Sequence, residues 1–188
     1  QLQGALAATQ DQIAWTVTFN IVGTAIVTPM TGWLTKRFGQ RHLMLTAVFG
    51  FAISSVMCGQ ATTLTELVVY RVFQGAFGGP LVPLSQAIIL GVFPKTLHSF
   101  ATAIWGMGVV CGPIVGPTVG GYISEAYSWR WVFYIIAPFS LLAFWGAWLY
   151  IRDTSRDKCA RLDWTGFISL SIALTALQLL LDRGNRLD

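Results

Sequence analysis

Six long apolar runs separated by short polar segments constrain this chain more than any other feature of its sequence. They cover residues 12–34, 43–60, 66–90, 100–123, 131–151 and 164–181. Each run reaches the roughly 18 residues that a helix needs to cross the hydrocarbon core of a bilayer. Because no water is present there to bind exposed backbone groups, each run is predicted to be a helix. The sequence therefore predicts an all-α, polytopic membrane protein with six transmembrane helices.

Composition supports lipid as the solvent. Hydrophobic residues make up 54% of the chain and charged residues 11%, against about 25% charged in an average soluble domain. The net charge of +4 comes from short basic segments between apolar runs, not from the long basic stripe of a nucleic-acid-binding protein. No nucleophile arrangement, metal cluster or phosphate-binding loop is recognisable, so we do not expect an enzyme. The cysteines form no CxxC pair, and Cys58 and Cys111 are predicted to be small apolar filler.

The charge of the connecting segments predicts which ends of the helices face the cytoplasm. Alternate connections, at 35–42, 91–99 and 152–163, carry eight basic residues: Lys36, Arg37, Arg41, Lys95, Arg152, Arg156, Lys158 and Arg161. The other connections and the two tails carry three, namely Arg130, Arg183 and Arg186. The positive-inside rule then places the first set in the cytoplasm. The N-terminal tail would lie outside, which predicts at least one further span before Gln1.

The first, second and fifth spans differ in polarity. The first carries a polar side chain at every fourth position: Thr16, Asn20, Thr24 and Thr28. This stripe is predicted to face protein or a watery cavity, although each threonine could instead bond to its own helix. The second and fifth spans are nearly apolar all round, and the fifth has aromatic residues at both ends. Both are predicted to face lipid.

The third span contains a charged residue at a depth where charge is costly. Thr63 and Glu66 have the spacing of a capping box at the start of the helix. Arg71 follows about 7 to 8 Å inside the predicted start and shares a face with Gln74 and Gly75. Such an arginine costs at least a few kcal/mol unless it meets water or an acid, or extends its side chain to the interface. The face ends at two prolines that should kink the helix, Pro80 and Pro83.

Glycine recurs at every fourth position of the fourth span: Gly108, Gly112, Gly116 and Gly120. Residues without side chains allow helices to approach closely, so this ladder is predicted to be a close seam against a neighbouring helix. Pro113 and Pro117 remove two backbone donors and should bend the helix. A ladder of this kind could also be a packing seam in any membrane protein.

Three motifs in the chain resemble those of major facilitator superfamily transporters. The segment GWLTKRFGQR at 32–41 is similar to the loop motif after the second span, and RVFQG at 71–75 to the fourth-span motif. The paired residues at 112–113, 116–117 and 120–121 resemble the fifth-span antiporter motif, which marks exporters. The stretches PLVPLSQAIIL, GGYISEAYSWRWVF and LQLLLDRGNRLD resemble the EmrB/QacA group of fourteen-span multidrug exporters.

This resemblance covers essentially the whole chain and implies a domain organisation. Residues 1–151 would be an N-terminal transmembrane bundle lacking its first span, 152–163 a cytoplasmic loop, and 164–188 an extra transmembrane helix with an outer loop. The implied function is proton-coupled export of amphipathic drugs or toxic compounds across the cytoplasmic (inner) membrane by alternating access. The proton would be the coupling ion, with no cofactor, metal or nucleic acid. Partners would be small amphipathic substrates, the lipid bilayer and, in Gram-negative relatives, a periplasmic adaptor and an outer-membrane channel.

The expected site residues fall into three groups. We expect polar groups on the cavity side at Asn20, Arg71, Gln74 and Gln86. The gating motif comprises Gly108, Gly112, Pro113, Gly116, Pro117, Gly120 and Gly121. The cytoplasmic loop motif comprises Gly32, Lys36, Arg37, Gly39 and Arg41, with Lys36 where the superfamily usually has an aspartate.

The chain offers no carboxylate at mid-membrane depth as the proton carrier. Five acidic residues lie at the ends of spans: Asp11, Glu66, Glu125, Asp163 and Asp182. The resemblance implies an aspartate in the preceding span instead. Two other functions stay open: a major facilitator uptake carrier for a metabolite, and a non-transporting structural or signalling membrane bundle in which the glycines serve packing alone.

Overall fold

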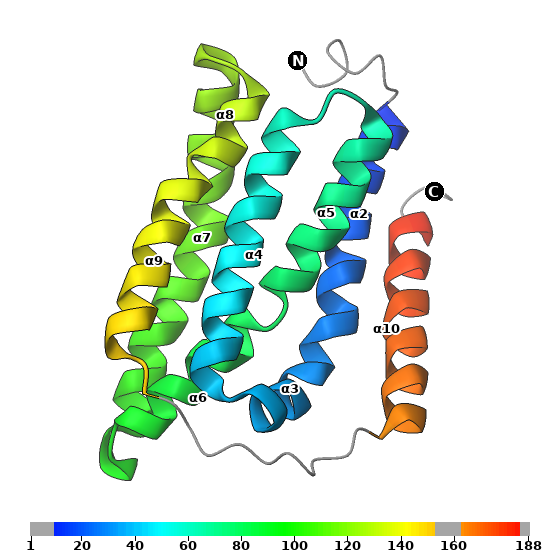
Figure 1. The fold of residues 1–188 in the computed structure, drawn as a ribbon. Helices are drawn as coiled ribbons and strands as arrows, with labels where there is room; N and C mark the ends of the chain where they lie inside the picture. The colour runs from blue at the N-terminus through cyan, green and yellow to red at the C-terminus, as the bar shows by residue number, and fades with distance from the viewer. Residues whose placement is uncertain (1–9, 153–162, 185–188) are drawn as a thin grey trace.

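The computed structural model describes residues 10–152 and 163–184 and consists there of helices packed side by side (Figure 1). Five helical segments are long and apolar enough to cross a membrane: Ile13–Phe38, Gln40–Gln60, Leu64–Val92, Lys95–Ala126 and Trp129–Tyr150. They confirm the all-helical membrane fold. The sixth predicted span also forms a helix, α10 (Trp164–Gly184), whose apolar part covers Trp164–Gln178. This part is shorter than the other five spans, so its crossing of the membrane stays a prediction.

The first span is built from three helical pieces. They are α2 (Gln10–Val27), a short 3-10 turn η1 (Thr28–Met30) that contains a proline, and α3 (Thr31–Phe38). Gly39 then turns the chain into α4 (Gln40–Gln60), with a φ of 85°. Side chains disfavour this positive φ, so the glycine of the loop motif has a structural reason to be there.

The third span begins with the predicted capping box. The backbone N–H of Glu66 donates to the Thr63 hydroxyl oxygen at 3.2 Å, and the Thr63 N–H donates to the Glu66 carboxylate at 3.3 Å. These bonds satisfy backbone donors at the start of α5 (Leu64–Gly78). The helix breaks before Pro80 and resumes as α6 (Leu81–Val92), as predicted for a proline kink.

The fourth and fifth spans are also each interrupted near one end. The fourth consists of the 3-10 turn η2 (Lys95–Leu97) and the long helix α7 (His98–Ala126). The fifth consists of α8 (Trp129–Tyr134) and α9 (Ile136–Tyr150). The side-chain oxygen of Ser128 accepts a bond from the Arg130 N–H at the start of α8.

Helix α4 lies at the centre of the bundle, between α5 on one side and α8 and α9 on the other (Figure 1). Helix α2 packs against the far side of α5, and α10 lies against α2. The prediction that the second span faces lipid is therefore wrong for the buried face of α4, whose small residues allow close packing, while Phe49, Ile53 and Met57 are exposed on another face. It holds for α9, whose Trp145 and Trp148 are exposed.

The ends of the helices alternate as the charge pattern requires. The α3–α4 junction, the α6–α7 junction and the end of α9 lie at one end of the bundle, and the α4–α5 and α7–α8 turns lie at the other (Figure 1). The predicted cytoplasmic segments thus flank the spans at a common end. Most of the 152–163 loop lies outside the described residues.

Candidate functional site

Arg71 lies on α5, where its side chain contacts Phe133 of α8 and its backbone oxygen accepts from Asn20 of α2. Arg71 is seven residues beyond Leu64, or about 10 Å along the axis. The guanidinium lies over the ring of Phe133 on α8, with its central carbon 4.6 Å from the ring centroid. One terminal N–H donates to the side-chain oxygen of Gln74 at 3.0 Å. The side chain therefore points towards Gln74, one turn further from the helix start, and not back to the interface.

Gln74 continues this contact into the neighbouring helix. It is 2% exposed, and its amide nitrogen donates to the hydroxyl oxygen of Ser55 on α4 at 2.7 Å. The Ser55 hydroxyl donates in turn to the backbone oxygen of Phe51 at 2.8 Å. A chain of hydrogen bonds thus runs from the guanidinium on α5 to the backbone of α4.

One donor of Arg71 remains unsatisfied within the described part of the chain. Its Nε atom is buried and has no hydrogen-bond partner there. A buried donor without a partner costs about 1 to 3 kcal/mol. The site therefore has an N–H that could bind an acceptor.

The predicted polar stripe of the first span faces protein and not a cavity. The Asn20 amide donates to the backbone oxygen of Arg71 at 3.0 Å, and the Thr24 hydroxyl donates to that of Gly75 at 3.1 Å. The Thr28 hydroxyl donates to the backbone oxygen of Gly79 at 3.3 Å. Three donors spaced by four residues on the first span thus meet three acceptors spaced by four on the third.

Bonding within the helix, the alternative for each threonine, also occurs. Thr16 donates only to the backbone oxygen of Ile13, at 2.7 Å. Thr24 and Thr28 divide their hydroxyls between their own helix and the third span. Asn20 is half-buried beside the backbone of Arg71, and its role on the cavity side stays a prediction.

The close helix seam lies between α2 and α5. A Cβ atom at Gly75 would collide with the backbone oxygen of Asn20, and one at Gly23 would lie 2.6 Å from the backbone oxygen of Val72. At Gly79 it would lie 3.0 Å from the oxygen of Thr24. The motifs identified in the sequence do not include this seam, although the four-residue spacing of Gly75 and Gly79 is a signal for it.

The glycine ladder of α7 is not a seam with any helix that the structure describes. A Cβ atom at Gly108, Gly112 or Gly116 would meet nothing within 4 Å, and one at Gly120 only a Val132 methyl at 3.8 Å. Gly108, Gly112 and Gly116 are exposed, whereas Gly120 lies near α8. Cys111 is also exposed on α7, so its predicted role as filler is wrong there, whereas Cys58 is buried as expected.

The remaining site residues are separated from Arg71. Gln86 is half-buried on α6, about 18 Å beyond Gln74 by helical rise. In the loop motif, Arg41 donates to the backbone oxygen of Trp148 at 2.8 Å, which satisfies a carbonyl in the last turn of α9. The others, Gly32, Lys36 and Arg37, are exposed.

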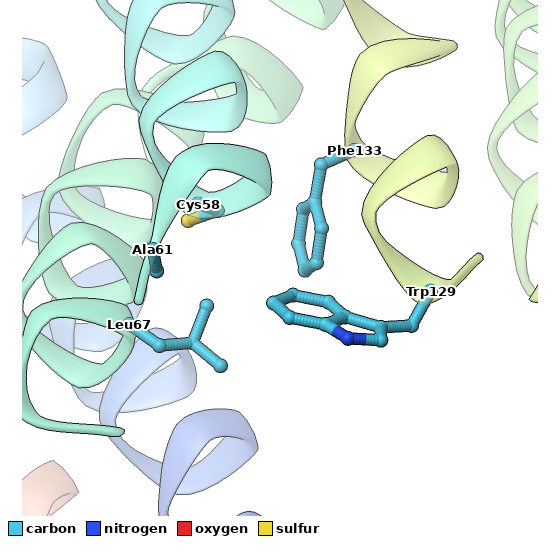
Figure 2. Packing of buried hydrophobic residues seen from close by; sticks show 5 residues of the cluster. All are labelled: Cys58, Ala61, Leu67, Trp129 and Phe133. Carbon is cyan, nitrogen blue, oxygen red and sulfur yellow. The ribbon is translucent and has the colours of Figure 1, made fainter. Parts of the chain in front are cut away.

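A compact apolar cluster closes the end of the bundle beside Arg71. It consists of Cys58, Ala61, Leu67, Trp129 and Phe133 (Figure 2). Trp129 and Phe133 make an edge-to-face contact with centroids 6.1 Å apart. Arg130 donates to the backbone oxygen of Ala61 at 3.1 Å and so ties α8 to the end of α4. Sequence periodicity gave no sign of this cluster, because α4 and α8 are apolar on several faces.

The acidic residues that the structure describes lie at helix ends. Glu66 belongs to the capping box and Glu125 is exposed near the end of α7. Asp163 accepts bonds from the Thr165 hydroxyl and the Gly166 N–H before α10, and these bonds lower its carboxyl pKa. The side chains of Asp11 and Asp182 lie outside the described residues.

Comparison with known proteins gives matches along the whole chain. The family model described as Major Facilitator Superfamily matches residues 1–181. The chain is 40% identical to the multidrug export protein EmrB of Escherichia coli K12 and 38% identical to the fatty acid resistance protein FarB of Neisseria gonorrhoeae. Each match covers 100% of this chain and 37% of the relative. The chain thus spans little more than a third of the length of these relatives.

A solved structure matches the fold. The xylose transporter XylE from E. coli, in a partially occluded inward open conformation, gives a TM-score of 0.70 at 19% identity. The match covers 97% of this chain and 53% of that transporter. At this identity the likeness concerns the arrangement of helices alone.

Proposed function

Because the chain belongs to the major facilitator superfamily, and thus to a family of transporters and not of enzymes, we propose that it forms part of a proton-coupled exporter of amphipathic drugs or toxic compounds. It is a multi-pass protein of the inner membrane. Residues 1–151 would supply most of an N-terminal bundle without its first span, 152–163 a cytoplasmic loop, and 164–188 an extra helix. A second bundle, outside this chain, would rock against the first to give alternating access.

The observation that carries this proposal is the position of Arg71. A guanidinium between apolar helices is costly in a purely structural bundle, and such residues usually mark transport pathways. Its donors are only partly used within the described residues, since Nε has no partner there. The names of the relatives that match this whole chain at 38% and 40% identity, which refer to fatty acid resistance and drug export, support an amphipathic substrate. A periplasmic adaptor and an outer-membrane channel are the partners we propose, as the resemblance to the EmrB/QacA group implies.

Export by a full-length transporter that carries this chain tests the proposal. Inverted vesicles should accumulate drug when a proton gradient is imposed, and an uncoupler should abolish the accumulation. Arg71→Lys keeps the charge but loses the planar fork, so it should impair uptake while membrane abundance stays unchanged. Normal export by both Arg71→Lys and Arg71→Ala would show that Arg71 has no part in the transport mechanism.

The same assay separates the alternative functions. A metabolite uptake carrier would move a sugar or similar solute into cells and leave drug uptake by inverted vesicles at background. A structural bundle would move neither. Either result would contradict the export proposal.

A further inference from the structure

We propose that Ser55 and Phe133 are positioning residues that fix the orientation of the Arg71 guanidinium, Ser55 through the amide of Gln74 and Phe133 through the face of its ring. This inference rests on the proposed function, in which Arg71 takes part in transport. Ser55 lies outside the segments recognised in the sequence, and Phe133 is the last residue of the stretch GGYISEAYSWRWVF, to which no role was assigned. The two residues come from different helices, α4 and α8.

Ser55 determines which end of the Gln74 amide faces Arg71. Its hydroxyl has one proton, which it donates to the backbone oxygen of Phe51, so its oxygen is left to accept from the Gln74 amide nitrogen. The amide oxygen then points at the guanidinium, which has donors only. Without the Ser55 acceptor, the amide could turn and present its own donors to Arg71.

Phe133 restricts the orientation of the Arg71 guanidinium from a second side. It is 5% exposed, and its edge-to-face contact with Trp129 keeps the ring in one orientation (Figure 2). The guanidinium carbon lies 4.6 Å from the ring centroid, well within the distance of a cation–π interaction. Such an interaction is stronger where water is excluded, as it is beside this apolar cluster.

Together these contacts leave a defined part of Arg71 available. One terminal nitrogen is bonded to Gln74 and one face of the guanidinium is covered by Phe133, while Nε is buried without a partner among the described residues. A change at Ser55 or Phe133 should therefore redirect Nε without removing the charge.

A pair of adjacent serines tests the first contact. Ser54 and Ser55 are both buried on α4, but the Ser54 hydroxyl bonds to backbone oxygens of its own helix, those of Gly50 and Phe51. In the full-length transporter, Ser55→Ala should lower the rate of proton-driven drug export about threefold to tenfold at unchanged abundance. Ser54→Ala should export at the original rate. Equal rates for the two variants would contradict the role of Ser55.

Fluorinated phenylalanine at position 133 tests the second contact. One, two and three ring fluorines progressively reduce the negative potential of the ring face with little change of shape. Export should fall stepwise along this series, by about threefold to tenfold in total, if the ring acts on the charge of Arg71. Rates that do not follow the number of fluorines would indicate packing alone and would overturn the role of Phe133.

A readout that does not depend on transport completes the test. The 15N resonance of Arg71 Nε can be assigned in lipid nanodiscs from the signal that Arg71→Lys removes. It should shift in Ser55→Ala and in the trifluorinated protein, and stay in place in Ser54→Ala. If the resonance moves neither in Ser55→Ala nor in the trifluorinated protein, the inference is overturned. If the unmodified transporter exports no drug, the proposed function fails, but the Nε resonance still decides whether these residues orient Arg71.

Discussion

The hydroxyl of Thr28, which also bonds to the backbone oxygen of Thr24, donates to the backbone oxygen of Gly79, 3.3 Å away. In a continuous helix that oxygen would accept from the N–H four residues later, which is Pro83 and has none. Backbone groups inside a membrane need partners within the protein. The last threonine of the polar stripe therefore allows the third span to break without an unpaired carbonyl.

We predict that the threonines facing α5 stabilise the bundle. Thr24→Val and Thr28→Val each keep the side-chain shape but remove a bond to the third span, so each should lower the free energy of unfolding by about 0.5 to 1.5 kcal/mol. Unfolding of the full-length transporter in detergent micelles measures this loss. Thr46→Val is the matched control, because Thr46 donates only to backbone oxygens of its own helix. An equal loss in the control would show that bonds between the helices contribute nothing extra.

We predict different effects of alanine at two glycines that each belong to a four-residue spacing pattern. Gly75→Ala places a methyl group against the backbone of Asn20, which cannot move as a flexible side chain could, so it should cost about 1 to 3 kcal/mol. Gly112→Ala meets nothing within 4 Å in the described structure and should leave the thermal midpoint of the bundle unchanged. Membrane abundance and melting of the purified protein measure both effects. Equal stability of the two variants would mean that the α2–α5 seam is looser than the structure shows.

The sequence allowed prediction of the spans, the capping box and the proline kink because each depends on residues close together in the chain. Packing partners depend on residues far apart. The ladder of α7 and the stripe of α2 have the same four-residue spacing, yet the stripe meets a described helix and the ladder does not. Periodicity identifies which residues share a face, but not which helix lies against that face.

The surroundings of Arg71 show the same limit. Arg71 and Gln74 lie one turn apart, so their contact follows from helix geometry. Ser55 and Phe133 are 16 and 62 residues away in the sequence, and many serines and phenylalanines in the apolar runs looked alike. Only the packing of α4 and α8 against α5 distinguishes them.

We predict that the 152–163 loop is cytoplasmic, and Cys159, outside the described residues, offers the test. An impermeant thiol reagent should fail to label Cys159 in intact cells, with the outer membrane made permeable where there is one, and should label it in inverted vesicles. Cys111 is exposed on α7 and should first be replaced by serine, whereas Cys58 is buried. Labelling of Cys159 in intact cells would show that the topology derived from the basic residues is inverted.

The last prediction concerns Gly116, whose side of α7 is exposed in the described structure. We predict that this glycine face becomes a close seam in the complete transporter, against a helix outside the described residues, and that the seam moves during alternating access. Gly116→Leu should then insert at near-normal abundance, since a bulky side chain meets no described neighbour. Transport should be lost, because a leucine would prevent the close approach of two helices.

Three measurements on the full-length Gly116→Leu variant distinguish gating from packing: membrane abundance, drug binding, and proton-driven drug uptake into inverted vesicles. Normal abundance and binding with uptake lost would support a moving seam. Retained uptake would contradict the gating role, since an exposed face that only contacts lipid tolerates a leucine. Loss of the protein from the membrane would show that the glycines are needed for packing alone. Gly91→Leu, at another exposed glycine with nothing within 4 Å and outside the ladder, is the control for bulk and should leave all three measurements unchanged.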